Sequence, residues 1–309
     1  MVVEKFLSLA NFQRAWDKVA LKQGCAGIDE ETIDEFRRNV RANLSQLREA
    51  VADSTYQPLP WKQVLIPKNK GGWRELKIPT VRDRIVQQAL LNVLTPVMDN
   101  KFASVSFAYR PNMSYINAVE QVARWRDLGY HWVLDADIAQ YFDNIDHQRL
   151  LREFRKHIDN PGILCLLKAW ISVGALTQGA VISPLLANIY LDEFDRIISA
   201  SPDFKLVRYA DDFLVLACTQ EQIVKAHAEV ERVLNSLGLA LHPKKTQITN
   251  FKRGFRFLGH GFLDNAIFPV ESPTTQSSSI RVESKEQRKK VSGSKQQNHK
   301  FWQGFRRRR

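Results

Sequence analysis

Apolar residues recur every three to four positions through several long stretches of the chain, a period that predicts amphipathic helices. Residues 1–54 follow it, with Phe12, Trp16 and Val19 on one face. The pattern is strongest over 81–98, where Ile85 and Val93 lie on the same side. Further helices are predicted over 114–127, 147–157, 162–172, 184–199 and 220–237.

Alternating or continuously apolar runs predict strands between these helices. They lie at 61–67 and 73–79 around a Gly-Gly turn, at 131–137, on both sides of 210–211, at 239–242 and at 255–259. Strands interspersed with helices and hairpins indicate an α+β fold rather than a parallel doubly wound sheet.

Asp211 and Asp212 are the only adjacent aspartates, and they lie at the expected tip of a hairpin. Leu206 and Val207 precede them, and an apolar run from Phe213 follows. Two such carboxylates repel each other, and a hard divalent cation relieves that repulsion. The pair therefore indicates a metal site for phosphoryl transfer, with a solvated Asp-Asp turn as the alternative.

Asp137 ends the predicted strand 131–137 and would lie beside the Asp-Asp tip if the two strands pair. Three converging carboxylates are enough for two Mg²⁺ ions about 4 Å apart. Asp135 is a competing acid on the same face of the strand, two residues away. The alternative for Asp137 is a helix N-cap or a surface acid.

Charge is concentrated at one end of the sequence. The net charge is +12, yet residues 281–309 hold eleven Lys or Arg and two Glu, a net +9, so the first 280 residues carry +3. A polyanionic partner is therefore plausible, and the polar tail after Pro269 is expected to be mostly disordered. The length of 309 residues leaves room for about two structural units.

The three cysteines, Cys25, Cys165 and Cys218, lie far apart and form no zinc spacing and no disulfide framework. A reducing, cytoplasmic compartment is expected. The N-terminus lacks the apolar core of a signal peptide. An uncharged stretch over 169–191 is long enough to span a bilayer, but its polar residues and Pro184 favour a buried loop and helix.

Blocks along the chain resemble, in family order, those of bacterial reverse transcriptases of the group II intron type, a superfamily that includes retron and CRISPR-associated enzymes. The resemblance covers residues 24–262. The matching segments are Gly27–Ile33, Ile66–Lys68, Gly71–Arg74, Ile78–Pro79, Asp83–Ala89, Ser106–Pro111, Asp137–His147, Gln178–Asn188, the Tyr209–Asp212 tetrad, Lys245–Thr246 and Phe257–Gly259.

This resemblance implies a right-hand polymerase with fingers and palm, in which helices back an antiparallel palm sheet. The expected division is a helical N-terminal extension at 1–54, fingers at 55–130, palm at 131–263, and a basic tail or reduced thumb at 264–309. Asp137, Asp211 and Asp212 would be the metal acids, joined by the Ile138 carbonyl. Two Mg²⁺ ions, or Mn²⁺, would be the cofactors.

Further residues take roles from the same resemblance. Lys68 and Arg74 would hold the incoming triphosphate, as charge-assisted donors beside a flexible turn; an ordinary charged hairpin is the alternative. Phe142 would abut the sugar and exclude a 2′-hydroxyl, or serve as a core aromatic. Gln178 and Gly179 would lie along the template or the nascent pair, glycine permitting close backbone approach.

Lys245 would act as general acid toward the leaving pyrophosphate, with a surface lysine as the alternative. Two positions depart from the family pattern: Thr177 replaces a usual proline, and Ala108 a usual glycine. Neither is expected to touch the metal site. Only 47 residues follow Phe262 and no Cys/His nuclease pattern occurs, so a full thumb and an intron-mobility role are in doubt.

The expected function is RNA-dependent DNA synthesis, in which a primer 3′-hydroxyl is extended with dNTPs on an RNA template. The expected partners are RNA template, DNA or RNA primer, and a protein such as a CRISPR adaptation integrase, with no membrane. Group II intron-like, CRISPR-associated and antiviral phage-defence settings remain open. The alternative is an RNA-binding maturase or splicing factor that does not require polymerase activity; RNA-templated RNA synthesis is disfavoured by Phe142 and the tetrad.

Overall fold

The computed structural model describes residues 2–67, 73–174, 176 and 179–270. These divide into two compact units, one up to Leu90 and the other covering Leu91–Val270. The boundary falls inside a helix, whereas the predicted boundaries at 54/55, 130/131 and 263/264 follow motif positions. The division into extension, fingers and palm stays a prediction. Of the basic tail or reduced thumb expected over 264–309, Ala266–Pro269 form a strand, and residues 271–309 lie outside the described residues.

The N-terminal unit is a set of helices followed by a hairpin. Its core includes Trp16 and Phe36, whose rings stack with centroids 4.8 Å apart. Thr32 begins the third helix with a capping box that it shares with Glu35. The elements are α1 (Val2–Phe6), α2 (Leu9–Leu21), α3 (Ile33–Arg38), α4 (Val40–Ala52), the antiparallel strands β1 (Lys62–Pro67) and β2 (Trp73–Ile78), and the first half of α5 (Val81–Asp99).

A loop at residues 22–32 docks on the start of α5. A Cβ at Gly27 would lie 2.6 Å from the Thr80 Cα, so only glycine allows this approach. Arg84 donates to the Cys25 carbonyl at 2.8 Å. The close contact explains why the chain has glycine at this position.

The second unit is built on an antiparallel sheet with the strand order β4-β5-β3-β6. Its strands are β3 (Trp132–Asp137), β4 (Phe204–Tyr209), β5 (Asp212–Ala217) and β6 (Gln247–Asn250). A second sheet contains β7 (Phe255–Phe257), β8 (His260–Leu263) and β9 (Ala266–Pro269). The helices are α6 (Tyr115–Asp127), η1 (Tyr141–Asn144), α7 (His147–Arg155), α8 (Pro161–Ser172), α9 (Ser183–Ser199) and α10 (Gln220–Ser236).

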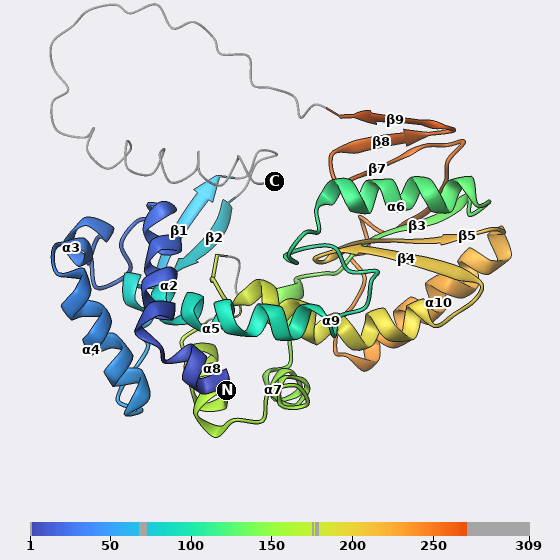
Figure 1. Ribbon diagram of the computed structural model, residues 1–309. Helices are drawn as coiled ribbons and strands as arrows, with labels where there is room; N and C mark the ends of the chain where they lie inside the picture. Colours follow the sequence, from blue (N-terminus) through green and yellow to red (C-terminus); the bar gives the residue numbers. More distant parts are fainter. Residues whose placement is uncertain (1, 68–72, 175, 177–178, 271–309) are drawn as a thin grey trace, which may run out of the picture. The chain divides into compact units, whose positions relative to one another are not determined.

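Both faces of the four-stranded sheet are covered (Figure 1). On one face, Val133, Val207 and Leu214 form a core with Val122 of α6 and with aromatic side chains that include Phe251. On the other face lie α9 and α10, and Phe194 of α9 meets Phe213 edge-on at 5.2 Å. The α+β class and the antiparallel sheet backed by helices are confirmed.

The helices predicted from periodicity are present, most with bounds within two residues of those expected, and Asp146 caps α7 as its position suggests. The strand predicted at 239–242 is wrong. That segment makes a single bridge, Leu241 to Ile138, which lies just past the end of β3, while β6 pairs with residues 132–135 of that strand. No helix among the described residues is long and apolar enough to cross a bilayer, including those at 169–191.

Candidate active site

The register of two central strands places the predicted acids side by side. Strand β3 pairs antiparallel with β5, and Asp137 lies directly opposite Asp212. At the same end of the sheet, the Ile138 amide donates to the Asp211 carbonyl at 3.2 Å. The expected pairing of the 131–137 strand with the Asp-Asp hairpin is confirmed, and it unites acids from two distant segments.

Asp211 lies in a two-residue hairpin turn. Tyr209 pairs with Asp212, which leaves Ala210 and Asp211 as the central residues. Ala210 has φ of 61°, in the left-handed region that favours glycine. This backbone conformation costs a non-glycine residue roughly 1–2 kcal/mol, so contacts with the surrounding structure must stabilise it.

The acids are partly shielded from solvent, and their charges oppose one another. Burial first, and then repulsion from the nearby carboxylates of Asp135, Asp137 and Asp211, together raise the pKa of Asp212 to about 7, against a weaker opposing effect of Lys245. Burial is also the main cause of the raised pKa of Asp211. The site therefore has an excess of negative charge.

Two side chains from the segment after α10 contact these acids. The Lys245 ammonium forms an ion pair with the Asp137 carboxylate. Gln247, on β6, donates to the Asp135 carboxylate at 3.1 Å. Burial raises the pKa of Asp135, so this second acid of β3 belongs to the same electrostatic cluster.

Among the described residues, no group of three or more His, Cys, Asp or Glu side chains is arranged to hold a metal ion. The donors nevertheless suit a hard cation: Asp137 and Asp212 face each other, Asp211 adjoins them, and every donor is oxygen. Besides burial, the carboxylates around Asp212 raise its pKa, and a divalent cation would balance their negative charge. The three-acid magnesium site stays a prediction.

The predicted substrate residues are only partly described. Phe142 lies in η1, half-buried, with its ring centroid 5.3 Å from that of Tyr141. Gly179 has φ of 117°, a conformation that L side chains rarely adopt. Arg74 lies on β2 opposite Ile66, in the other compact unit. Lys68, Gln178 and the Arg74 side chain lie outside the described residues.

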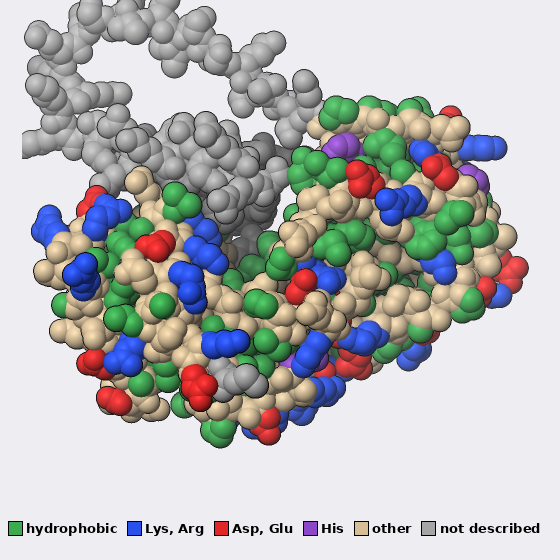
Figure 2. All heavy atoms as spheres, viewed as in Figure 1, with side chains coloured by type: hydrophobic (Ala, Val, Ile, Leu, Met, Phe, Trp, Pro, Cys, Tyr) green, Lys and Arg blue, Asp and Glu red, His purple; other side chains and the backbone are tan. Residues whose placement is uncertain are grey.

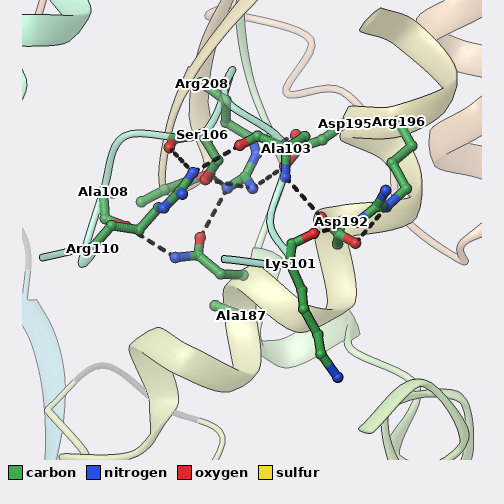
Figure 3. Close-up of polar contacts among 12 residues, drawn as sticks. Lys101, Ala103, Ser106, Ala108, Arg110, Ala187, Asp192, Asp195, Arg196 and Arg208 are labelled. Atoms are coloured by element: carbon green, nitrogen blue, oxygen red, sulfur yellow. Dashed lines mark hydrogen bonds and ion pairs between the residues drawn. The ribbon is translucent and has the colours of Figure 1, made fainter. Parts of the chain in front are cut away.

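A buried polar network beside the acids was not foreseen (Figure 3). Arg208, on β4, is 1% exposed and contacts Asp195 of α9 through both arms of its guanidinium, with Nε 2.6 Å from Oδ1. It also donates to Asn188 at 3.2 Å and to Ser106 at 2.9 Å. Burial alone would lower the pKa of Arg208, but the Asp195 carboxylate raises it, so the guanidinium stays charged.

A sequence signal for this network exists. Arg208 interrupts the apolar strand that leads to the tetrad, and Asp195 lies on the apolar face of α9, between Leu191 and Ile198. A charge at a position that should be buried requires a partner. The spacing of residues along the sequence does not identify Asp195 as the partner of Arg208, because α9 and β4 come into contact only when the chain folds.

Comparisons with known proteins agree on one family. The family model described as reverse transcriptase (RNA-dependent DNA polymerase) matches residues 66–262. Protein YkfC of Escherichia coli (strain K12) is 32% identical over 284 residues, covering 76% of this chain and 74% of YkfC.

The group II intron-encoded protein LtrA of Lactococcus lactis subsp. cremoris is 31% identical over 185 residues, which are 56% of this chain and 30% of LtrA. Among solved structures, telomerase from Candida albicans, in complex with a fragment of telomeric RNA, superposes with a TM-score of 0.53 at 16% identity, covering 77% of this chain and 51% of telomerase. This last likeness concerns the fold alone.

Proposed function

The chain belongs to the reverse transcriptase (RNA-dependent DNA polymerase) family, and from this premise we propose that it extends a primer 3′-hydroxyl with dNTPs on an RNA template. The observation that supports this most is the register that sets Asp137 opposite Asp212, with Asp211 beside them. A nucleotidyl transfer site needs such a cluster of oxygen donors at a fixed point.

In this proposal Asp137, Asp211, Asp212 and the Ile138 carbonyl hold Mg²⁺, with Mn²⁺ as a possible substitute. When bound, the ions would neutralise phosphate charge and lower the pKa of the primer hydroxyl. The protein's own contribution is rigid placement, since the acids sit at the ends of hydrogen-bonded strands.

The remaining residues act on the substrates. Lys245, whose ammonium lies at Asp137, donates a proton to the leaving pyrophosphate. Phe142 packs against the sugar and excludes a 2′-hydroxyl. Arg74 and Lys68 bind the triphosphate, and Gly179, with Gln178, lies along the template or the nascent pair.

The decisive experiment is primer extension on an RNA template with dNTPs and Mg²⁺. Wild type extends the primer, and Asp211→Asn, which keeps the shape but removes a ligand charge, loses at least about a hundredfold in rate. Asp203→Asn, an exposed acid at the other end of the hairpin, serves as the matched control and retains wild-type extension. Equal extension by wild type and Asp211→Asn refutes the proposal.

The same variant separates polymerase from maturase. Splicing or RNA-folding activity that survives Asp211→Asn, with no primer extension by wild type, favours the RNA-binding alternative. The cytoplasmic location and the intron, CRISPR or defence setting, with an integrase partner in the CRISPR case, are further parts of the proposal. Sequencing the nucleic acid that co-purifies with the protein distinguishes these settings.

A further inference from the structure

Strand pairing alone does not fix the turn that carries Asp211. The ladder between β4 and β5 ends at the pair Tyr209–Asp212, and the two residues beyond it lie outside the sheet. Ala210 adopts φ of 61° there. A turn of this kind needs contacts beyond the β4–β5 ladder to hold one conformation, and the Ile138 amide, which donates to the Asp211 carbonyl, provides one of them.

The Arg208 side chain links the turn to segments outside the hairpin. Its Nη1 donates to the Ala210 carbonyl at 2.9 Å, within the turn itself. Its other contacts run to Asp195 and Asn188 of α9 and to Ser106. The guanidinium therefore joins the turn to helix α9 through one planar group, and Figure 3 shows these bonds converging on it.

Helix α9 also holds the segment that follows Asp137. The Tyr141 hydroxyl donates to the Ala187 carbonyl at 2.7 Å, and Tyr141 is 4% exposed. Ala187 adjoins Asn188, the residue that Arg208 contacts. Consecutive residues of one helix thus anchor both acid-bearing segments.

The loop before α6 joins the same cluster. The Arg208 main-chain amide donates to the Val105 carbonyl at 2.8 Å, and the Arg208 carbonyl accepts from the Phe107 amide at 2.9 Å. Asn188 donates to the Ala108 carbonyl at 2.9 Å. Hydrogen bonds therefore hold both the main chain and the side chain of Arg208 in place.

Stability alone does not account for this arrangement. Burying an ion pair loses the hydration of both charges, and apolar side chains of similar volume are often as stabilising or more so. What a guanidinium offers, and an apolar group does not, is several directed bonds from a single rigid plane. The network is suited to fixing geometry.

We propose that Arg208 is a positioning residue: with Asp195 and Asn188 it ties the Ala210–Asp211 turn to α9, and Tyr141 ties the Asp137 segment to the same point. The inference rests on the proposed function, because it concerns the placement of the metal acids. It assigns a role in that site to residues that do not contact the reacting atoms.

The test uses the full chain in two variants. Arg208→Lys keeps the charge beside Asp195 but loses the planar fork, and Tyr141→Phe removes one hydroxyl. The control is Asn11→Ala, which removes a buried side chain that donates to Phe6 and Ala89 in the other compact unit. Primer extension gives kcat and the half-saturating Mg²⁺ concentration, and thermal unfolding with Mg²⁺ and with EDTA gives the metal-dependent shift in Tm.

We expect both variants to lower kcat and to raise the half-saturating Mg²⁺ concentration, by about tenfold for Arg208→Lys and about threefold for Tyr141→Phe, with the KM for primer–template within about twofold of wild type. Their Mg²⁺-dependent shift in Tm shrinks as well. Asn11→Ala lowers Tm but leaves the metal response unchanged.

If both variants lose Tm as the control does, yet keep wild-type kcat and Mg²⁺ response, the positioning role is wrong. Should Arg208→Lys fail to fold, Tyr141→Phe decides the matter by the same measurements. If wild type extends no primer, the proposed function fails by itself. The Mg²⁺-dependent shift in Tm, compared among the proteins that fold, then decides the positioning role without any activity.

Discussion

Asp212 is the most electrostatically crowded residue of the site. It is held away from water among three other carboxylates, which raises its pKa to about 7 through burial and then through repulsion. A fold selected for stability alone would not gather acids in this way. Sites that bind cations accept such repulsion because the cation relieves it.

Asp212→Asn should therefore stabilise the protein when no divalent metal is present. The pKa of Asp212 is raised in the folded state, so folded wild type loses stability as the pH rises through about 7 and this carboxyl ionises. The amide of the variant does not ionise, so the variant does not lose stability in this way. We expect a gain of about 2 kcal/mol at pH 8 that fades toward pH 4.

Thermal or urea unfolding in EDTA across this pH range measures the effect, with Asp203→Asn as an exposed acid for comparison. A lower stability of Asp212→Asn at pH 8 would contradict the electrostatic account.

At this scale the sequence was most informative about the acids that gather at one end of the sheet. Asp137, Asp211 and Asp212 were identified as acids at strand ends, and the structure pairs those strands. Arg208 was not identified, because its importance comes from partners on α9. The motifs point to the clustered acids, but they do not reveal what holds those acids in place.

Phe142 offers a test of sugar selection. Its ring is half-buried beside Tyr141, five residues beyond Asp137. Phe142→Ala should open space for a 2′-hydroxyl and raise ribonucleotide use relative to deoxynucleotide use, by roughly 10- to 100-fold. Single-nucleotide incorporation with matched dNTP and rNTP pools measures the ratio, and an unchanged ratio would assign Phe142 to the core alone.

Among the elements, the docking of the 22–32 loop on α5 depends on one missing side chain. A Cβ at Gly27 would meet the Thr80 backbone at 2.6 Å from Cα and 2.8 Å from the amide nitrogen. Backbone atoms cannot swing aside as a flexible side chain can. The loop and helix therefore require glycine at their contact.

Gly27→Ala is expected to destabilise the protein by about 2–3 kcal/mol through overpacking. Gly162, an exposed glycine in α8, is the matched control. A Cβ at this position would have the Asn160 Oδ1, at 3.4 Å, as its nearest neighbour. Gly162→Ala should raise stability by roughly 0.5–1 kcal/mol, since alanine favours a helix. Urea midpoints measure both, and a neutral Gly27→Ala would show that the backbones can separate.

Elements whose apolar pattern is long were predictable, and several short ones were not. Helix α5 shows a sustained helical period over 19 residues. The strands β6, β8 and β9, of four residues each, were not foreseen. So few residues hold too little pattern to identify a strand, and β6 in addition pairs with β3, a strand distant in sequence.

For the whole molecule, positive charge is unevenly distributed along the chain. On the face shown in Figure 2, Lys and Arg side chains are interspersed with Asp and Glu. The first 280 residues carry a net +3, against +9 for residues 281–309. Non-specific attraction to nucleic acid should therefore depend strongly on the C-terminal segment.

Replacing Arg306–Arg309 by serine should weaken binding to single-stranded RNA and lower the slope of log affinity against log salt by up to about 3. Fluorescence anisotropy over a KCl series measures both. The control is the double serine variant of Lys225 and Arg232, which should change the slope little. These exposed cations of α10 pair with Glu221 and Glu229. Equal slopes for wild type and the tail variant would place the phosphate contacts elsewhere.

The boundary between the compact units illustrates what a sequence cannot reveal at this scale. It falls between Leu90 and Leu91, in the middle of α5, where the apolar period continues without a break. An apolar period indicates that one face of a helix is buried, but it does not indicate which elements cover that face.

The enclosure of the Arg208–Asp195 pair, with both side chains 1% exposed, has a practical consequence. Ionic strength screens charges in contact with solvent and hardly reaches those sealed from it. Concentrated salt should therefore strip adhering RNA from the surface while leaving the acid-bearing turn undistorted. A preparation washed in molar KCl and then desalted is expected to recover its full catalytic rate.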